Sequence, residues 1–229
     1  MGYHSRVTEA QPWVAPIVEE LRRFYEPQPD PPHEAFGFYL WFVLGQRTIP
    51  LKRDAAMSAL RRIPALTPDS LWKAPRAKLQ AAVAHVGPPE ERLHAVMSGV
   101  EVFRRYRNLD QRVRGPLLEA RRATRLLVGL GQLGAQWMLL AAGNHPILPR
   151  HPGVGRVAVR LGVVPRPPQP GVAAQAYAVR AIAAMVPRDA AFLKIAVQYL
   201  SHHAAVTCIP ADPHCRICPL AIDCQFALS

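Results

Sequence analysis

Apolar residues recur along this chain with the spacing of α-helices. Between residues 13 and 24 they are three or four positions apart, and Glu and Arg side chains fill the positions between them. Such spacing places the apolar residues on one face of a helix and the charges on the other. Residues 33–46 are almost continuously apolar, which predicts a buried helix.

The amphipathic pattern then continues over most of the chain. No stretch alternates apolar and polar residues in the way of a half-buried strand, and there is no repeat of fixed period. We therefore predict an all-α fold of roughly ten helices. The further segments that each predict one or two helices are residues 50–63, 67–86, 88–108, 172–186 and 190–207.

Prolines and small polar residues mark the ends of these segments. Thr67, with Ser70 nearby, and Pro88–Pro89, followed by two glutamates, are typical helix starts. Two proline-rich stretches, residues 27–32 and residues 164–171, interrupt the helical pattern and predict connections.

The charge of the chain indicates a polyanionic partner. It holds 28 Lys and Arg against 16 Asp and Glu, which gives a net charge of +12 and a pI near 10.3. A basic surface attracts nucleic acid because binding to phosphates releases their counterions. The alternative is a proteome that is basic in general, and the net charge alone does not separate the two.

The compartment is expected to be the cytoplasm, with no membrane association. Residues 1–24 contain no apolar block suited to a signal peptide, and no apolar run approaches the ~20 residues that span a bilayer. In that reducing environment clustered cysteines more often bind metal than form disulfides.

All four cysteines lie within residues 208–224, in the spacing C-x6-C-x2-C-x5-C: Cys208, Cys215, Cys218 and Cys224. Zinc sites of four cysteines usually use two close C-x2-C pairs, whereas only one such pair occurs here. Four cysteine ligands also serve a [4Fe–4S] cluster. A cluster, a zinc ion and a disulfide are the three alternatives that the residues leave open.

This cysteine spacing, at the C-terminal end of a basic helical chain, resembles the cluster loop of the endonuclease III family of DNA glycosylases. The resemblance implies a [4Fe–4S] cluster bound by the four cysteines. It also implies that basic side chains of the loop face DNA phosphate, a position that Arg216 occupies here.

The same family carries a helix-hairpin-helix motif, Leu-Pro-Gly-Val-Gly-x-Lys-Thr-Ala, whose glycine turn directs backbone N–H groups at a phosphate. Two stretches resemble it, "LVGLGQLGA" at residues 127–135 and "HPGVGRVA" at residues 151–158. The first keeps the family's order of motifs and is the alignment that we favour. Gly129 and Gly131 are then the hairpin glycines, and Arg156 matches an arginine near the DNA.

In this alignment the catalytic residues of the family are replaced. Leu133 occupies the position of the lysine nucleophile, and His151 occupies the position of the aspartate. Between Arg125 and Asp189 the chain contains no Asp, Glu or Lys. His151 is a candidate acid or base, since the ordinary pKa of histidine is about 6.5, and a carboxylate from elsewhere in the chain, such as Glu119 or Asp189, is the alternative.

Two further positions resemble family residues that enter the duplex. Gln46, in "LWFVLGQRT", matches a glutamine that lies near the extruded base, and Pro88 matches an apolar wedge. The resemblance implies two lobes, residues 27–143 as a bundle that ends in the hairpin and residues 1–26 plus 144–229 as the cluster domain. DNA is expected to bind in the cleft between them.

The sequence thus favours a monomeric, nucleoid-associated base excision repair protein that binds damaged or distorted duplex DNA. Its N-glycosylase activity is expected to be weak, altered or monofunctional, without Schiff-base lyase chemistry, because Leu133 has no amine. The alternative is a catalytically inactive DNA-binding module that keeps the cluster for structure or redox sensing.

Overall fold

A computed structural model describes residues 14–165 and 172–228, apart from the side chains of residues 172–176. The proline-rich connection predicted at residues 164–171 lies largely outside the described residues. The described chain holds twelve α-helices and three short 3₁₀-helices and no strand, so the all-α prediction is confirmed. None of these helices is long and apolar enough to span a bilayer.

The chain divides into two compact units. Unit 2 comprises residues 30–145, and unit 1 comprises the described parts of residues 1–29 and 146–229. The helices of unit 2 are α2 (Ala35–Gly45), α3 (Pro50–Arg61), α4 (Pro68–Lys73), α5 (Arg76–Val83), η1 (Ala84–Val86), α6 (Pro89–Arg105), α7 (Leu109–Arg114), α8 (Leu117–Arg125) and α9 (Gly131–Ala141).

Helix α2 is the core of unit 2, as its apolar run predicts. It packs against α3, α6, α7 and α9, and the side chains of Phe38, Tyr39 and Leu40 are fully buried. The aromatic ring of Tyr39 lies against the backbone of α6 at Gly99, where a Cβ atom would stand only 2.0 Å from the ring. A side chain at position 99 would therefore separate the two helices.

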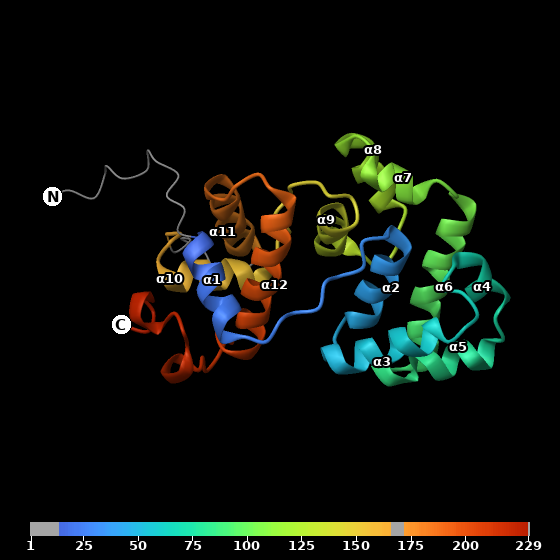
Figure 1. Ribbon diagram of the computed structural model, residues 1–229, viewed down its shortest axis with the longest axis horizontal. Helices are drawn as coiled ribbons and strands as arrows, with labels where there is room; N and C mark the ends of the chain where they lie inside the picture. The colour runs from blue at the N-terminus through green and yellow to red at the C-terminus, as the bar shows by residue number, and fades with distance from the viewer. Residues whose placement is uncertain (1–13, 166–171, 229) are drawn as a thin grey trace. The chain divides into compact units, whose positions relative to one another are not determined.

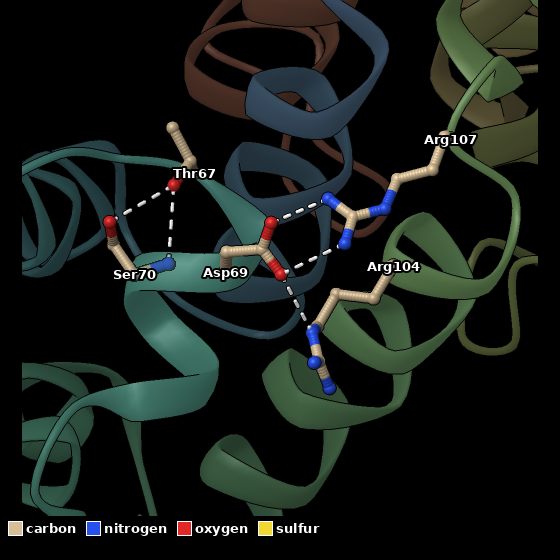
Figure 2. Close-up of polar contacts among 5 residues, drawn as sticks. All are labelled: Thr67, Asp69, Ser70, Arg104 and Arg107. Carbon is tan, nitrogen blue, oxygen red and sulfur yellow. Dashed lines mark hydrogen bonds and ion pairs between the residues drawn. The ribbon is translucent and has the colours of Figure 1, made fainter.

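A cluster of polar contacts joins α4 to the far end of α6 (Figure 2). Thr67 caps α4, since its hydroxyl oxygen accepts a hydrogen bond from the Ser70 N–H at 3.2 Å, as the sequence predicts. Asp69 receives hydrogen bonds from Arg104, at 2.9 Å, and from Arg107. The guanidinium groups of Arg107 and then Arg104 hold the pKa of the Asp69 carboxyl below its ordinary value.

In unit 1, α1 lies along α12, and α10 packs against both α11 and α12 (Figure 1). The contact between α1 and α12 buries Val14, Val18 and Leu21 of α1, which is the apolar face that the periodicity predicts. The helices of this unit are α1 (Val14–Phe24), α10 (Pro152–Leu161), α11 (Val172–Met185), α12 (Ala190–Val206), η2 (Cys215–Ile217) and η3 (Ala221–Asp223).

Candidate nucleic-acid interface and metal centre

The connection between α8 and α9 is a glycine turn. Gly129 has φ +92° and Gly131 has φ +56°, a region of backbone conformation that side chains disfavour. Both residues are exposed, and no atom lies within 4 Å of the place where a Cβ of Gly131 would stand. In the alternative stretch, Gly153 and Gly155 lie inside α10 and neither has a positive φ. The turn geometry therefore favours residues 127–135 as the hairpin.

The carbonyl groups of this turn are bound from within unit 2. The Val128 carbonyl accepts a hydrogen bond from the Tyr39 hydroxyl at 2.9 Å, and the Gly129 carbonyl accepts one from Gln46 Nε2 at 2.5 Å. The same Tyr39 hydroxyl lies 2.7 Å from the Ala95 carbonyl. Burial raises the pKa of Tyr39 to about 12, so the hydroxyl keeps its proton and remains a donor.

The N–H groups that follow are free for a partner. In the part of the chain that the structure describes, the N–H groups of Gly131, Gln132 and Leu133 have no hydrogen-bond partner. The first N–H group of α9 that has a hydrogen-bond partner is that of Gly134, which donates to the Leu130 carbonyl at 2.9 Å. Unpaired N–H groups at a helix start, where the helix dipole is positive, suit a phosphate.

The two predicted duplex-entering residues lie in two other loops of unit 2. Gln46 follows the last residue of α2, and its side chain contacts the hairpin through the bond to Gly129. Pro88 is exposed and precedes α6 directly. Arg92, near the start of α6, donates to the Gln46 carbonyl at 2.6 Å. Sequence reasoning missed Tyr39 and Arg92, because a tyrosine in an apolar run and an arginine on a polar helix face carry no functional signal.

The two positions that replace the family's catalytic residues lie in different units. Leu133 is a half-buried apolar residue in the first turn of α9. His151 caps α10, since its Nδ1 accepts the Gly153 N–H at 3.2 Å. In the neutral ring the proton is therefore on Nε2. Burial, and then the charge of Arg156, lower the pKa of His151 to about 4.

The two arginines predicted to bind DNA have different surroundings. Arg156 is half-buried, and its guanidinium donates to the carbonyls of Cys208, at 3.0 Å, and Ala204, at 2.7 Å. It thereby ties α10 to the end of α12. Arg216 is exposed in η2 and has no hydrogen-bond or ion-pair partner among the described residues.

The four cysteines line a single cavity, together with Arg160 and His203. All four are free thiols, and Cys224 is buried while the other three are half-buried. Burial raises the pKa of the Cys218 thiol, and the neighbouring thiols of Cys224, Cys208 and Cys215 add to this. The described residues contain no group of three His, Cys, Asp or Glu side chains placed to hold a metal ion.

Arg160 holds this loop against α10, a role that the sequence does not signal. Its Nη1 donates to Cys208 Sγ at 3.3 Å and to the Ile209 carbonyl at 2.7 Å, and its Nη2 donates to the Pro210 carbonyl at 2.7 Å. The Cys224 thiol in turn donates to the backbone carbonyl of Arg160 at 3.4 Å.

His203 connects the cysteines to α1. Its Nδ1 lies 2.7 Å from the Tyr25 hydroxyl, which is also 2.6 Å from Thr207 Oγ1, and its Nε2 lies 3.8 Å from Cys218 Sγ. The imidazole is buried, and burial and the neighbouring His202 lower its pKa to about 4. The neutral ring can accept a hydrogen bond from the Tyr25 hydroxyl at Nδ1 and direct its Nε2–H at Cys218 Sγ.

No protein-family model matches the sequence, and a search of curated proteins finds no relative. Solved structures do match. A trapped covalent intermediate of endonuclease III with DNA, an estranged-adenine complex, has a TM-score of 0.71 at 17% identity, over 96% of this chain and 97% of that one. This chain has the endonuclease III-like glycosylase fold.

Two further structures with the endonuclease III-like fold agree. A non-covalent endonuclease III–DNA complex matches with the same TM-score of 0.71, 17% identity and coverage of 96% and 97%. A thermostable thymine-DNA glycosylase matches with a TM-score of 0.69 at 15% identity, over 94% of this chain and 95% of that one. The resemblance predicted from the cysteine spacing is thereby confirmed for the fold.

Proposed function

We propose that this protein binds duplex DNA through the hairpin and acts on damaged or distorted sites as an endonuclease III-like base excision repair protein. The observation that carries the proposal is the turn at Gly129 and Gly131, whose carbonyls are bound inside unit 2 while three following N–H groups are unpaired. The net charge of +12 and the fold shared with two endonuclease III–DNA complexes support it.

The chemistry proposed is N-glycosidic hydrolysis that is weak, altered or monofunctional. In this reaction water adds to the sugar C1′, the bond from C1′ to the base breaks, and the base leaves with the electron pair and gains a proton. Schiff-base lyase chemistry needs an amine nucleophile, which the leucine at position 133 does not supply. His151 presents Nε2–H, so its contribution is limited to donating a hydrogen bond.

A second candidate is a DNA-binding module without turnover. It is favoured by the place of His151 as a helix cap with a pKa of about 4 and by the lack of any Asp, Glu or Lys between Arg125 and Asp189. Hydrolysis by an activated water needs a base.

A panel of lesion duplexes separates the two candidates. Purified protein is incubated with duplexes that carry an oxidised pyrimidine, uracil, an alkylated purine or an abasic site, and binding and base release are measured on the same samples. Release from any duplex supports the glycosylase, and binding with no release supports the module. Binding to none contradicts both. A borohydride-trapped covalent adduct would contradict the absence of lyase chemistry.

We also propose that Cys208, Cys215, Cys218 and Cys224 hold a [4Fe–4S] cluster. Their thiols share one cavity, and a set of four thiolates is the usual donor set for this group. A bound cluster supplies a redox-active centre and cross-links the loop to the rest of unit 1. Stoichiometric iron and sulfide with brown colour are expected, whereas zinc without sulfide would contradict the assignment.

The protein is proposed to act as a monomer in the cytoplasm, associated with the nucleoid. A monomeric mass by light scattering, both free and with a short duplex, is expected. A dimer in the presence of DNA would contradict the monomer.

A further inference from the structure

Arg92 lies between the loop that precedes α6 and the end of α2. Its Nη1 donates to the Val43 carbonyl at 3.1 Å, and its Nη2 donates to the Gln46 carbonyl at 2.6 Å. On the other side, its Nε stands 3.2 Å from the position that a Cβ of Gly87 would take. The side chain thus extends from the loop that precedes α6 to the end of α2.

The guanidinium group fits the end of α2 for a physical reason. The last carbonyls of a helix have no partner within it, and they carry the negative end of the helix dipole. Gln46 leaves the helical conformation, with φ −65° and ψ 125°, and Arg47 follows with a left-handed φ of 54°. A planar fork of N–H groups bonds two carbonyls at once, which the single ammonium of lysine does less well.

The contact continues to the hairpin. Arg92 holds the backbone of Gln46, and the side chain of Gln46 donates to the Gly129 carbonyl. One chain of hydrogen bonds therefore runs from Arg92 through Gln46 to the glycine turn. All of these residues belong to unit 2.

We propose that Arg92 is a positioning residue, which fixes Gln46 and the Gly129 turn in the conformation that receives DNA. The proposal rests on the proposed DNA binding. In this role Arg92 acts through these two residues, since each of its terminal nitrogens donates to a carbonyl of the segment 43–46.

The DNA-free test is hydrogen exchange of the backbone amides. Arg92→Gln is expected to speed exchange of the Gly134 amide, which donates to the Leu130 carbonyl of the turn, about tenfold or more, without a change in α4. Arg92→Lys is expected to speed this exchange nearly as much, although lysine keeps the positive charge. The matched control is Arg107→Gln, at the other end of α6, where the charge is paired with Asp69 (Figure 2). Exchange of the Gly134 amide that is unchanged in Arg92→Gln would overturn the proposal, whether or not the protein binds DNA.

The DNA test is the salt dependence of affinity for an undamaged duplex. For Arg92→Gln we expect affinity about tenfold lower with an unchanged slope of log K against log salt, because no phosphate contact is lost. Arg107→Gln should change affinity less than about twofold. A slope that falls by about one, or affinity restored by Arg92→Lys, would assign Arg92 a direct phosphate contact instead.

A double variant tests whether the residues act in one chain. Because Gln46 acts downstream of Arg92, the loss in Arg92→Gln/Gln46→Ala should be close to that of the larger single loss. Strictly additive losses would contradict the proposal. If the wild-type protein binds no duplex, the proposed function fails, while the exchange experiment still decides the role of Arg92.

Discussion

The hairpin before α9 and the cysteine loop after α12 are stabilised in the same way but present different chemical groups. In both, side chains from a neighbouring helix donate to the backbone carbonyls of an irregular segment: Tyr39 and Gln46 to the hairpin, Arg156 and Arg160 to the loop. In the hairpin the groups without a partner are the N–H groups of Gly131, Gln132 and Leu133. In the cysteine loop, the remaining polar groups are thiols that line a common cavity.

The comparison shows that hydrogen bonds to backbone carbonyls can prepare an irregular segment for two different kinds of ligand. Hydrogen bonds to carbonyls fix a short segment without regular structure, because they satisfy groups that no ladder or helix satisfies. The polar groups that remain without a partner in the segment then decide what the segment binds. Unpaired N–H groups suit an anion, and converging thiols suit metal. A substitution in the hairpin should therefore leave the iron content unchanged, and a substitution in the cysteine loop should leave DNA binding unchanged.

The largest effect is expected for Cys218→Ala. The variant loses one of four proposed ligands, so iron and sulfide per chain should fall to a small fraction of the wild-type value, measured by chemical analysis and by visible absorbance. Ile217→Ala, a change at an exposed neighbour, should keep both. Full iron and sulfide in Cys218→Ala would remove this cysteine from the ligand set.

Gly129→Ala should weaken DNA binding without loss of iron. At φ +92° an added side chain costs about 1–2 kcal/mol, so the turn should shift and affinity for a duplex should fall about tenfold. Gly115→Ala is the matched control, since Gly115 has an ordinary φ of −71°. Equal affinities of the two variants, measured by fluorescence anisotropy, would contradict the role of the turn.

Tyr39→Phe tests the inner side of the hairpin. Removing the hydroxyl leaves the Val128 and Ala95 carbonyls without this donor in the core, which should cost about 1–3 kcal/mol of unfolding free energy. Urea unfolding measures the loss, and a few-fold weaker DNA binding should accompany it. Tyr106→Phe is the control, because the Tyr106 hydroxyl has no hydrogen-bond partner among the residues described. A stability equal to wild type would show that the two carbonyls do not need Tyr39.

The smallest effect near neutral pH is the pH dependence that His151 contributes. Its pKa is about 4 when folded and about 6.5 when unfolded, so the unfolded chain binds the extra proton between these values. Stability should therefore fall as pH decreases from about 6.5 to about 4, by at most about 1.4 kcal/mol per pH unit from this group. His151→Asn keeps a capping side chain and removes the titration.

The comparison of His151→Asn with wild type isolates this one histidine from the other groups that titrate. Melting temperatures recorded from pH 4 to pH 8 should run parallel above about pH 6.5, and below it the wild-type value should fall more steeply than that of His151→Asn. Parallel curves over the whole range would show that His151 is not buried as a neutral cap. Activity that is lost in His151→Asn while its stability is kept would instead support a part in catalysis.

Several features of this protein follow from local sequence alone. The period of apolar residues is a property of the helix itself, so α1 and α6 are recognisable before any packing is known, and α2 is recognisable by its continuous apolar run. Thr67 ahead of Pro68 marks a helix start by a contact that spans three residues. The cysteine spacing, likewise local, leads to the fold that the solved structures share.

The contacts that define the candidate sites were decided only by tertiary structure. Tyr39 and Val128 are 89 residues apart, Arg92 and Gln46 are 46 apart, and Tyr25 and His203 are 178 apart. No local pattern distinguishes these residues from an ordinary core tyrosine or a surface arginine. Their hydrogen bonds exist because helix packing brings a donor to a carbonyl or an imidazole that would otherwise be buried without a partner. Sequence thus determined which helices and which turn form, and packing decided that the carbonyls of the turn are bound inside and its N–H groups are left for a partner.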